Sequence, residues 1–204
     1  YGADSKIAFE GVSMLDAPPE TLRQLRGNRI GMIFQEPMTS LNPFMRIGEQ
    51  LGEAIAAHHP KTPAEQIRAR CKTLLERVGI NETERRLKQY PHEFSGGQLQ
   101  RIMIAMALIN EPDLLIADEP TTALDVTIQA EILDLLHDLQ RQMGMAIIFI
   151  THDLGLAEHY AENVCVMRHG QIVEKGGIKQ VFADPQHEYT VELINATPKG
   201  LKEP

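Results

Sequence analysis

The chain has 204 residues, 43% of them hydrophobic and 24% charged, which is typical of a folded globular protein with one domain or two small ones. Its net charge of -8 argues against a partner held through nucleic-acid phosphates, because surfaces that bind them are usually basic. The longest apolar runs also fall well short of the roughly twenty residues that a membrane-crossing helix needs.

The cysteines and the first residues indicate a compartment. Cys71 and Cys165 lie in apolar patterns without the spacing of a metal site, which predicts small hydrophobic residues in a reducing environment. The chain opens on Tyr1-Gly2-Ala3-Asp4 without a charged-then-apolar leader, so we expect a cytosolic location. Any connection to a membrane would then run through another subunit.

The first half of the chain changes from strand patterns to helix patterns. Residues 6–9 and 30–34 have the pattern of strands, and the second run is apolar enough to be buried on both faces of a parallel sheet. Residues 36–92 carry helical patterns broken by prolines, which predicts an inserted helical region. Its clearest helix should begin at Thr62-Pro63-Ala64-Glu65, where a capping box and a first-turn proline coincide.

After Pro112, strand and helix patterns alternate. Residues 114–117 form a short apolar run, residues 126–142 have a helical period, and residues 145–151 form a second buried strand. This alternation predicts an α/β fold with a mainly parallel sheet and with ligands at the carboxyl ends of the strands. Residues 164–174 predict a small hairpin, and a short helical tail follows.

Two adjacent carboxylates, Asp118 and Glu119, directly follow the apolar run at residues 114–117. At the end of a strand, one acid can hold the water shell of a Mg2+ bound between phosphates, and the next can orient or deprotonate the attacking water. Charged pairs also end many buried strands without such a role. The pair therefore becomes informative only together with its neighbours in the sequence.

A second informative segment is Ser95-Gly96-Gly97-Gln98, which precedes a helix with the apolar core IMIAMALI. Ser95 is predicted to cap this helix, with Gln98 as its reciprocal capping-box partner. The glycines would let a phosphate approach the N–H groups at the positive end of the helix dipole. Taken alone, these residues predict only a well-formed helix start.

Together these features resemble the ATPases of the ATP-binding cassette (ABC) family, whose motifs recur here in the family order and spacing. The motifs are Gln35 at the Q-loop, Phe94 to Gln98 at the signature usually written LSGGQ, Leu114 to Glu119 at the Walker B strand, Ala123-Leu124-Asp125 at the D-loop, and His152 at the switch histidine. Phe94 replaces the usual leucine, at a position that packs instead of contacting phosphate.

The resemblance implies a role for each residue near the phosphates. Asp118 would hold the Mg2+ water shell, Glu119 would act as general base toward the attacking water, and His152 would contact the γ-phosphate of ATP. Gln35 would sense Mg2+ and couple the site to the helical region.

The resemblance also implies a dimer. Two cassettes would meet head to tail, and the signature residues of one would cover ATP bound by the other, with Asp125 lining the interface. The signature residues concerned are Ser95, Gly96, Gly97 and Gln98.

The flanking sequences resemble the ATPase subunits of oligopeptide, dipeptide and related importers. The clearest match is residues 184–198, DPQHEYTVELINATP, with Glu188 where proline is usual. The implied partners are a second cassette, two transmembrane permease subunits and, indirectly, a solute-binding protein. The subunit would sit peripherally on the cytoplasmic side of the inner membrane.

The family fold is a P-loop NTPase-like α/β core with a mainly parallel sheet and an inserted helical subdomain. On this chain it would assign residues 1–35 and 113–180 to the core, 36–112 to the helical and signature subdomain, and 181–204 to a C-terminal tail. No G-x-x-x-x-G-K-[ST] loop occurs in the 204 residues. We therefore expect a fragment that lacks the Walker A portion and hydrolyses little ATP by itself.

Two other classes of function stay open at this stage. A cassette ATPase acting on nucleic acid or the ribosome would share the nucleotide motifs, although such relatives usually carry long insertions or coiled-coil arms that this sequence does not show. A non-catalytic pairing module would keep the signature surface without turnover. The transported solute stays open too, because the permease and the binding protein contact it.

Overall fold

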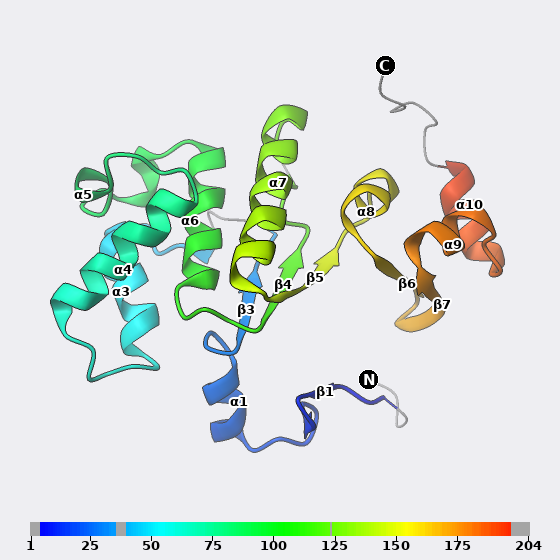
Figure 1. Ribbon diagram of the computed structural model, residues 1–204, viewed down its shortest axis with the longest axis horizontal. Helices are drawn as coiled ribbons and strands as arrows, with labels where there is room; N and C mark the ends of the chain where they lie inside the picture. Colours follow the sequence, from blue (N-terminus) through cyan, green and yellow to red (C-terminus); the bar gives the residue numbers. More distant parts are fainter. Residues whose placement is uncertain (1–4, 36–39, 123, 197–204) are drawn as a thin grey trace. The chain divides into compact units, whose positions relative to one another are not determined.

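The computed structural model describes residues 5–35, 40–122 and 124–196. Contacts within the chain separate it into two compact units, one of Ile7–Ile150 and one of Tyr1–Lys6 with Thr151–Pro204. The first unit holds a parallel sheet and most of the helices, and the second holds a β-hairpin with short helices (Figure 1). The division into a core, a helical subdomain and a tail remains a prediction.

A parallel sheet forms the centre of the first unit. Within the described residues it consists of β3 (Ile30–Ile33), β4 (Leu114–Asp118) and β5 (Ala146–Ile150), with β4 in the middle. Each strand lies within its predicted range or one residue beyond it. The parallel pairing confirms the predicted α/β fold class.

One face of the sheet is covered. Ile33 and Leu115 have no exposed surface, and α6 (Gly96–Leu108) packs against β3. A Cβ atom at Gly31 would lie 2.5 Å from the carbonyl oxygen of Ala107, so only a glycine allows this close approach. The close packing of α6 thus explains why β3 contains Gly31, although glycine has a low propensity for strands.

The other face of the sheet is open. Met32 alternates with buried residues of β3, and Ile148 and Ile150 alternate with half-buried residues of β5; the three side chains are 38%, 49% and 44% exposed. The prediction that residues 30–34 and 145–151 are buried strands is therefore wrong for this face. The apolar sequence is that of a two-sided strand, but the described helices cover one side only.

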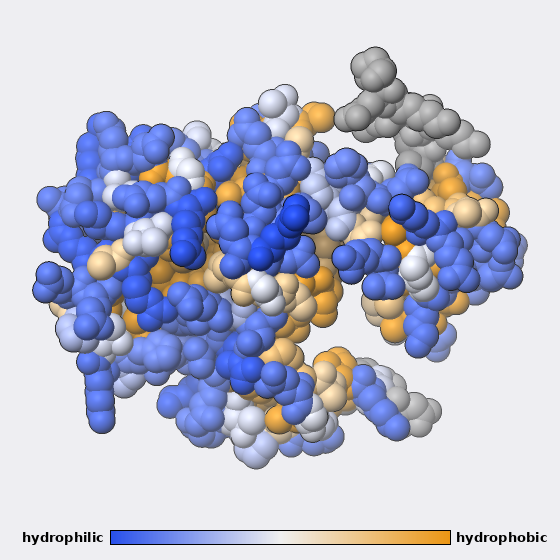
Figure 2. Space-filling model, in the orientation of Figure 1, coloured by the Kyte–Doolittle hydropathy of each residue, from blue (hydrophilic) through white to orange (hydrophobic). Residues whose placement is uncertain are grey.

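The helices between β3 and β4 pack around their own apolar core. They are α3 (Ile47–Ala56), α4 (Ala64–Arg77), α5 (Thr83–Arg86), the 3₁₀ turn η1 (Pro91–Glu93) and α6. Helix α3 contacts α4 and α6, and α4 also contacts α6. Their outer surface is mostly hydrophilic (Figure 2). The core side chains without exposed surface include Ile47, Leu51, Ile55, Leu75, Ile102 and Ile104.

Helix α4 begins one residue later than its sequence predicts. Pro63 is the N-cap instead of the first helical residue, and no side chain caps the helix, so the predicted capping box at Thr62 does not form. The helix ends as predicted near Gly79, whose φ is +78°. Cys71 is buried in this helix, and burial raises the pKa of its thiol to about 11, as expected for a packing residue.

Helix α7 (Val126–Met143) connects β4 to β5 and agrees with the predicted helix at 126–142. It buries Ile132, Leu136 and Leu139 and contacts α6. Gly144 ends it in a left-handed conformation with a φ of +67°, the usual helix C-terminus for glycine.

A short N-terminal segment precedes the sheet. Strands β1 (Ala8–Phe9) and β2 (Val12–Ser13) form a small antiparallel pair, followed by α1 (Pro19–Leu25). Arg29 forms an ion pair with Asp113, which joins the residue before β3 to the residue before β4.

The second unit is built on the predicted hairpin. Its elements are α8 (Leu154–Tyr160), β6 (Asn163–Arg168), β7 (Gln171–Gly177), α9 (Ile178–Ala183) and α10 (Glu188–Ala196). Strands β6 and β7 are antiparallel, and α9 packs against both.

A carboxylate of β7 holds the start of α10. The Glu174 carboxylate accepts the backbone N–H of Gln186 at 2.8 Å and that of His187 at 3.1 Å. These bonds, that of Gln186 first, lower the pKa of Glu174.

In this unit Cys165 is exposed. Among the residues that the structure describes, no helix has the length and apolarity to span a membrane.

Candidate functional site

The sheet brings predicted site residues to one edge. Because β3 and β4 are parallel neighbours, Gln35 leaves β3 at the same edge at which Asp118 ends β4. Glu119 comes directly after Asp118, and both carboxylate residues are half-buried. This is the position at which ligands bind in open α/β sheets.

Gln35 and Glu119 are in direct contact. The Gln35 side-chain Nε2 donates a hydrogen bond to Glu119 Oε2 at 2.9 Å, across 84 positions of sequence. An amide that donates through its nitrogen presents its carbonyl oxygen elsewhere, and that oxygen is a ligand type that Mg2+ accepts. The pairing links the Q-loop and Walker B positions within one unit.

The backbone of Glu119 is unusual. Its φ is +44°, in the left-handed region that non-glycine residues rarely adopt. Two backbone bonds hold it there, since its N–H donates to the Ile150 carbonyl at 3.0 Å and its own carbonyl accepts the Thr122 N–H at 3.1 Å. Such strain concentrates at functional positions, and here it sets the direction in which the Glu119 side chain leaves the strand.

Thr122 is a residue of this site that the sequence patterns do not single out. Its Oγ1 donates a hydrogen bond to Glu119 Oε2 at 2.9 Å, the same oxygen that Gln35 contacts. The available signal is the turn itself, because the backbone bond from Thr122 to Glu119 places residue i+3 beside the side chain of residue i. We call residues 119–122 the Glu119 turn.

The signature segment forms the predicted helix start. Ser95 Oγ accepts the Gln98 N–H at 3.4 Å, and Gln98 Oε1 accepts the Ser95 N–H at 3.1 Å. This reciprocal pair is a capping box at the N-terminus of α6, as predicted. Ser95 and Gly96 are exposed, so the positive end of this helix is accessible.

The signature glycines also serve packing. A Cβ atom at Gly97 would lie 3.1 Å from Ile128 Cγ2 on α7, and one at Gly96 would lie 4.0 Å from Leu124 Cδ2. Gly97 therefore allows α6 and α7 to approach each other at their N-termini. The sequence argument assigned both glycines to phosphate approach, and the structure adds this packing reason for Gly97.

Phe94 packs as expected for its position. It is half-buried, and the Arg86 guanidinium lies over its ring at 5.3 Å from the centroid. The aromatic ring thus gains a cation–π contact that a leucine could not make.

The loop from the Glu119 turn into α7 is held by side chains of two helices. Gln100 of α6 is buried and its Nε2 donates to the carbonyl of Pro120. Gln129 of α7 donates to the carbonyls of Thr121 and Leu124, both at 3.1 Å.

Asp125, predicted to line a dimer interface, has a defined local role. It is the N-cap of α7 and its Oδ1 accepts the Ile128 N–H at 3.0 Å. Ala123, the first residue of the predicted D-loop, lies outside the described residues.

His152 belongs to the second compact unit. It is exposed and lies between Thr151 and Asp153, where Thr151 Oγ1 accepts the Asp153 N–H at 3.0 Å. Asp153 in turn caps α8 by accepting the N–H groups of Gly155 and Leu156. The role of His152 at a phosphate stays a prediction.

The oxygen donors at the sheet edge fit a hard cation. Asp118 supplies a carboxylate and Gln35 an amide carbonyl, the ligand types suited to Mg2+ with bound water. Within the described ranges, no group of three or more His, Cys, Asp or Glu side chains could hold a metal by protein ligands alone. This donor set fits an ion whose remaining ligands are water and phosphate.

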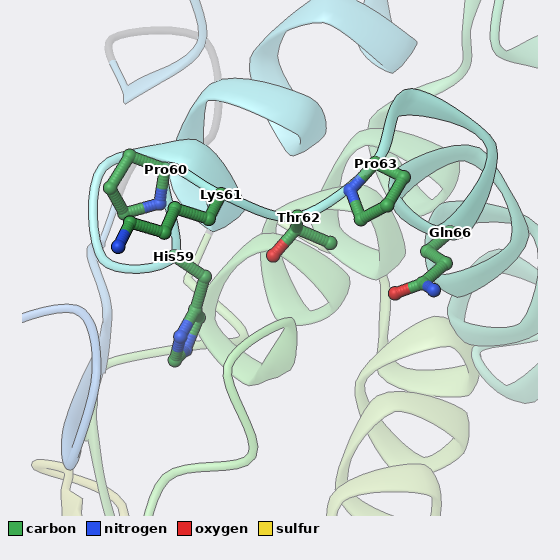
Figure 3. Close-up of a pocket in the computed structure, with 6 residues that line it drawn as sticks. All are labelled: His59, Pro60, Lys61, Thr62, Pro63 and Gln66. Atoms are coloured by element: carbon green, nitrogen blue, oxygen red, sulfur yellow. The ribbon is translucent and has the colours of Figure 1, made fainter.

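A surface hollow of about 460 Å³ lies elsewhere in the first unit, in the loop before α4. The side chains that line it spread along the loop and onto the first turn of α4 instead of converging (Figure 3). None of the predicted site residues lines this hollow. The lining residues are His59, Pro60, Lys61, Thr62, Pro63 and Gln66.

The parallel sheet, the carboxylates that follow its central strand and the capped helix beside it define a member of the P-loop NTPase fold class. Comparison with known proteins narrows this class. The family described as ABC transporter matches residues 3–122, more than half of the chain. The chain belongs to the ABC transporter family.

The relatives that the chain matches include transport ATP-binding proteins. The chain is 61% identical over 195 residues to the peptidoglycan transport ATP-binding protein YejF of Agrobacterium fabrum, which covers 96% of this chain and 36% of that protein. It is 52% identical over 198 residues to the oligopeptide transport ATP-binding protein OppD of Bacillus subtilis, covering 97% of this chain and 55% of OppD. The chain thus spans only about a third to a half of these relatives.

Solved structures give the same family. The dimeric ATP-binding cassette MJ0796, in a post-hydrolysis state bound to ADP and Pi, matches with a TM-score of 0.74 at 26% identity, over 86% of this chain and 74% of that one. CbiO1 of Clostridium perfringens, part of the ABC transporter complex cbiONQ, matches with a TM-score of 0.74 at 33% identity. The match covers 93% of this chain and 70% of cbiO1.

Proposed function

We propose that this chain contributes the Walker B and signature parts of an ATPase that energises uptake of peptides or related small solutes. The observation that carries the proposal is the hydrogen bond of 2.9 Å between Gln35 and Glu119, which joins two separate family motifs at one sheet edge. The relatives named for peptidoglycan and oligopeptide transport support the solute class.

The proposed chemistry is in-line hydrolysis of ATP. Glu119 accepts a proton from the attacking water as the water oxygen bonds the γ-phosphorus and the bond from that phosphorus to the ADP oxygen breaks, so that ADP leaves. Asp118 and the carbonyl oxygen of Gln35 would hold the water shell of the metal. Bound Mg2+ would neutralise charge on the phosphates. His152 would contact the γ-phosphate.

The proposed assembly is a head-to-tail dimer of cassettes. The exposed, capped start of α6 supports a role for Ser95 to Gln98 in covering ATP held by a partner, because helix N-termini attract phosphate. Two transmembrane permease subunits and a solute-binding protein would complete the importer. The cassettes would lie on the cytoplasmic side of the membrane.

The test is association in trans. An intact cassette of the family, with its catalytic glutamate replaced by glutamine, is mixed with this chain in Mg2+ and ATP, and complex formation is measured by analytical ultracentrifugation. We expect ATP-dependent association. Ser95→Asp should abolish it, because aspartate keeps the N-cap but places a negative charge against phosphate.

Ser13→Arg, at an exposed serine of β2, is the control for an unrelated surface change. It should associate like the unaltered chain. Failure of the unaltered chain to associate, or equal association of the Ser95→Asp variant, contradicts the proposal.

A further inference from the structure

We propose that Thr122 is a positioning residue for the general base Glu119, an inference that rests on the proposed function. The Thr122 hydroxyl and the Gln35 amide converge on one oxygen, Glu119 Oε2, each at 2.9 Å. Two donors on one carboxylate oxygen fix the orientation of the carboxyl plane as well as its position.

The two donors, Gln35 and Thr122, differ in how they are connected to Glu119. Gln35 comes from the end of β3 and is exposed, and the proposed function also requires its amide near a metal. Thr122 lies three residues from Glu119 in the same turn, and its own N–H already bonds the Glu119 carbonyl at 3.1 Å. Thr122 therefore holds Glu119 through both backbone and side chain, whatever Gln35 does.

The surrounding scaffold fixes where the Thr122 hydroxyl lies. Gln100 bonds the Pro120 carbonyl, and Gln129 bonds the Thr121 carbonyl at 3.1 Å, so the peptide units between Glu119 and Thr122 are held from two helices. Glu119 itself has a φ of +44°, a conformation that needs such support. A hydroxyl on a fixed turn loses little entropy when it bonds the carboxylate.

The experiment follows the Glu119 carboxyl carbon by ¹³C NMR in the 204-residue chain, assigned by its loss in Glu119→Gln. Thr122→Val keeps the shape but removes the donor. We expect its Glu119 carboxyl resonance to shift at constant pH, because the carboxylate loses the hydrogen bond from the Thr122 hydroxyl. Asp118, the adjacent carboxylate, is the same in every variant, so its influence cancels.

Two further variants separate the hydroxyl from the methyl group. Thr122→Ser should restore the original position of the Glu119 resonance, since it retains the hydroxyl donor. Thr127→Val, at an exposed threonine of α7, is the matched control and should leave the Glu119 resonance where it is in the unaltered chain. Thr122→Ala replaces Thr122→Val if urea unfolding shows that the valine variant does not fold.

A donor-free variant whose Glu119 resonance stays where it is in the unaltered chain overturns the inference. So does a serine variant that behaves like the valine variant, because packing of the methyl group would then explain the effect. These measurements need no ATP and no partner. Failure of the trans association therefore contradicts the proposed function alone.

Discussion

Two segments of the first unit, the signature helix start at Ser95 to Gln98 and the Glu119 turn, are built in different ways. At Ser95 to Gln98 both bonds of the capping box join residues three apart. At the Glu119 turn the backbone is left-handed and the site depends on Gln35, 84 positions away, and on Gln100 from α6. The signature helix start is stabilised by bonds between its own residues. The Glu119 turn is stabilised by bonds from residues that are distant in sequence.

The largest effect should come from removing the support of the Glu119 turn. Gln100→Leu leaves the Pro120 carbonyl without its buried donor and should lower the free energy of unfolding by about 1 to 3 kcal/mol. Urea unfolding measures this. Gln142→Leu, at an exposed glutamine of α7, should change stability by less than about 0.5 kcal/mol. Equal effects at both positions would mean that the link from α6 does not support the turn.

Replacement by glycine and by alanine should give opposite orders of stability in the Glu119 turn and at the signature helix start. At Glu119, whose φ is +44°, the glycine variant should be more stable than the alanine variant by about 1 to 2 kcal/mol. At Gln98, inside α6, alanine should be more stable than glycine by roughly 0.5 to 1 kcal/mol. Thermal unfolding of the four variants checks the comparison, and the same order at both sites would contradict it.

The N-caps Ser95 and Asp125 should contribute similar amounts to the free energy of unfolding, but only Ser95 should be energetically coupled to Gln98. Ser95→Ala and Asp125→Ala should each cost about 1 kcal/mol, because each removes an N-cap oxygen. Gln98→Ala should add little to Ser95→Ala, since the two side chains form one reciprocal unit. In combination with Asp125→Ala, its cost should add in full. A double-mutant cycle by urea unfolding distinguishes these cases.

The smallest effect should come from a cap that is distant in sequence. Glu174 accepts N–H groups ahead of α10, and its pKa is lowered in the folded state. Its contribution is therefore present above the ordinary glutamate pKa of about 4.3 and is lost as the pH falls through the lowered value. Glu174→Gln should be slightly less stable than the unaltered chain at pH 7, and the difference should vanish at acidic pH.

This comparison also explains which features the sequence predicts. The capping box and α7 depend on spacings of three and four residues, so their patterns suffice. The parallel sheet follows from alternation of strands and helices. The placement of Gln35 and Glu119 at one phosphate site is predicted only by resemblance to a known family, and the hydrogen bond between them is visible only in the structure.

Thr122 and the open sheet face could not be predicted for physical reasons. Thr121 and Thr122 are chemically identical in the sequence, and only the left-handed turn decides which hydroxyl reaches Glu119. The apolar sequence at 30–34 is compatible with a strand that is covered on one face and with a strand that is covered on both. Burial on the second face depends on what packs there, and that is a property of tertiary structure.

The open face of the sheet has a calorimetric consequence. Met32, Ile148 and Ile150 already contact water in the folded chain, on the two strands that flank β4. Unfolding therefore hydrates less new apolar surface than the size of the chain implies. The heat-capacity change of unfolding should therefore fall below the usual value of about 12 to 15 cal/mol/K per residue. A smaller change gives a flatter dependence of stability on temperature.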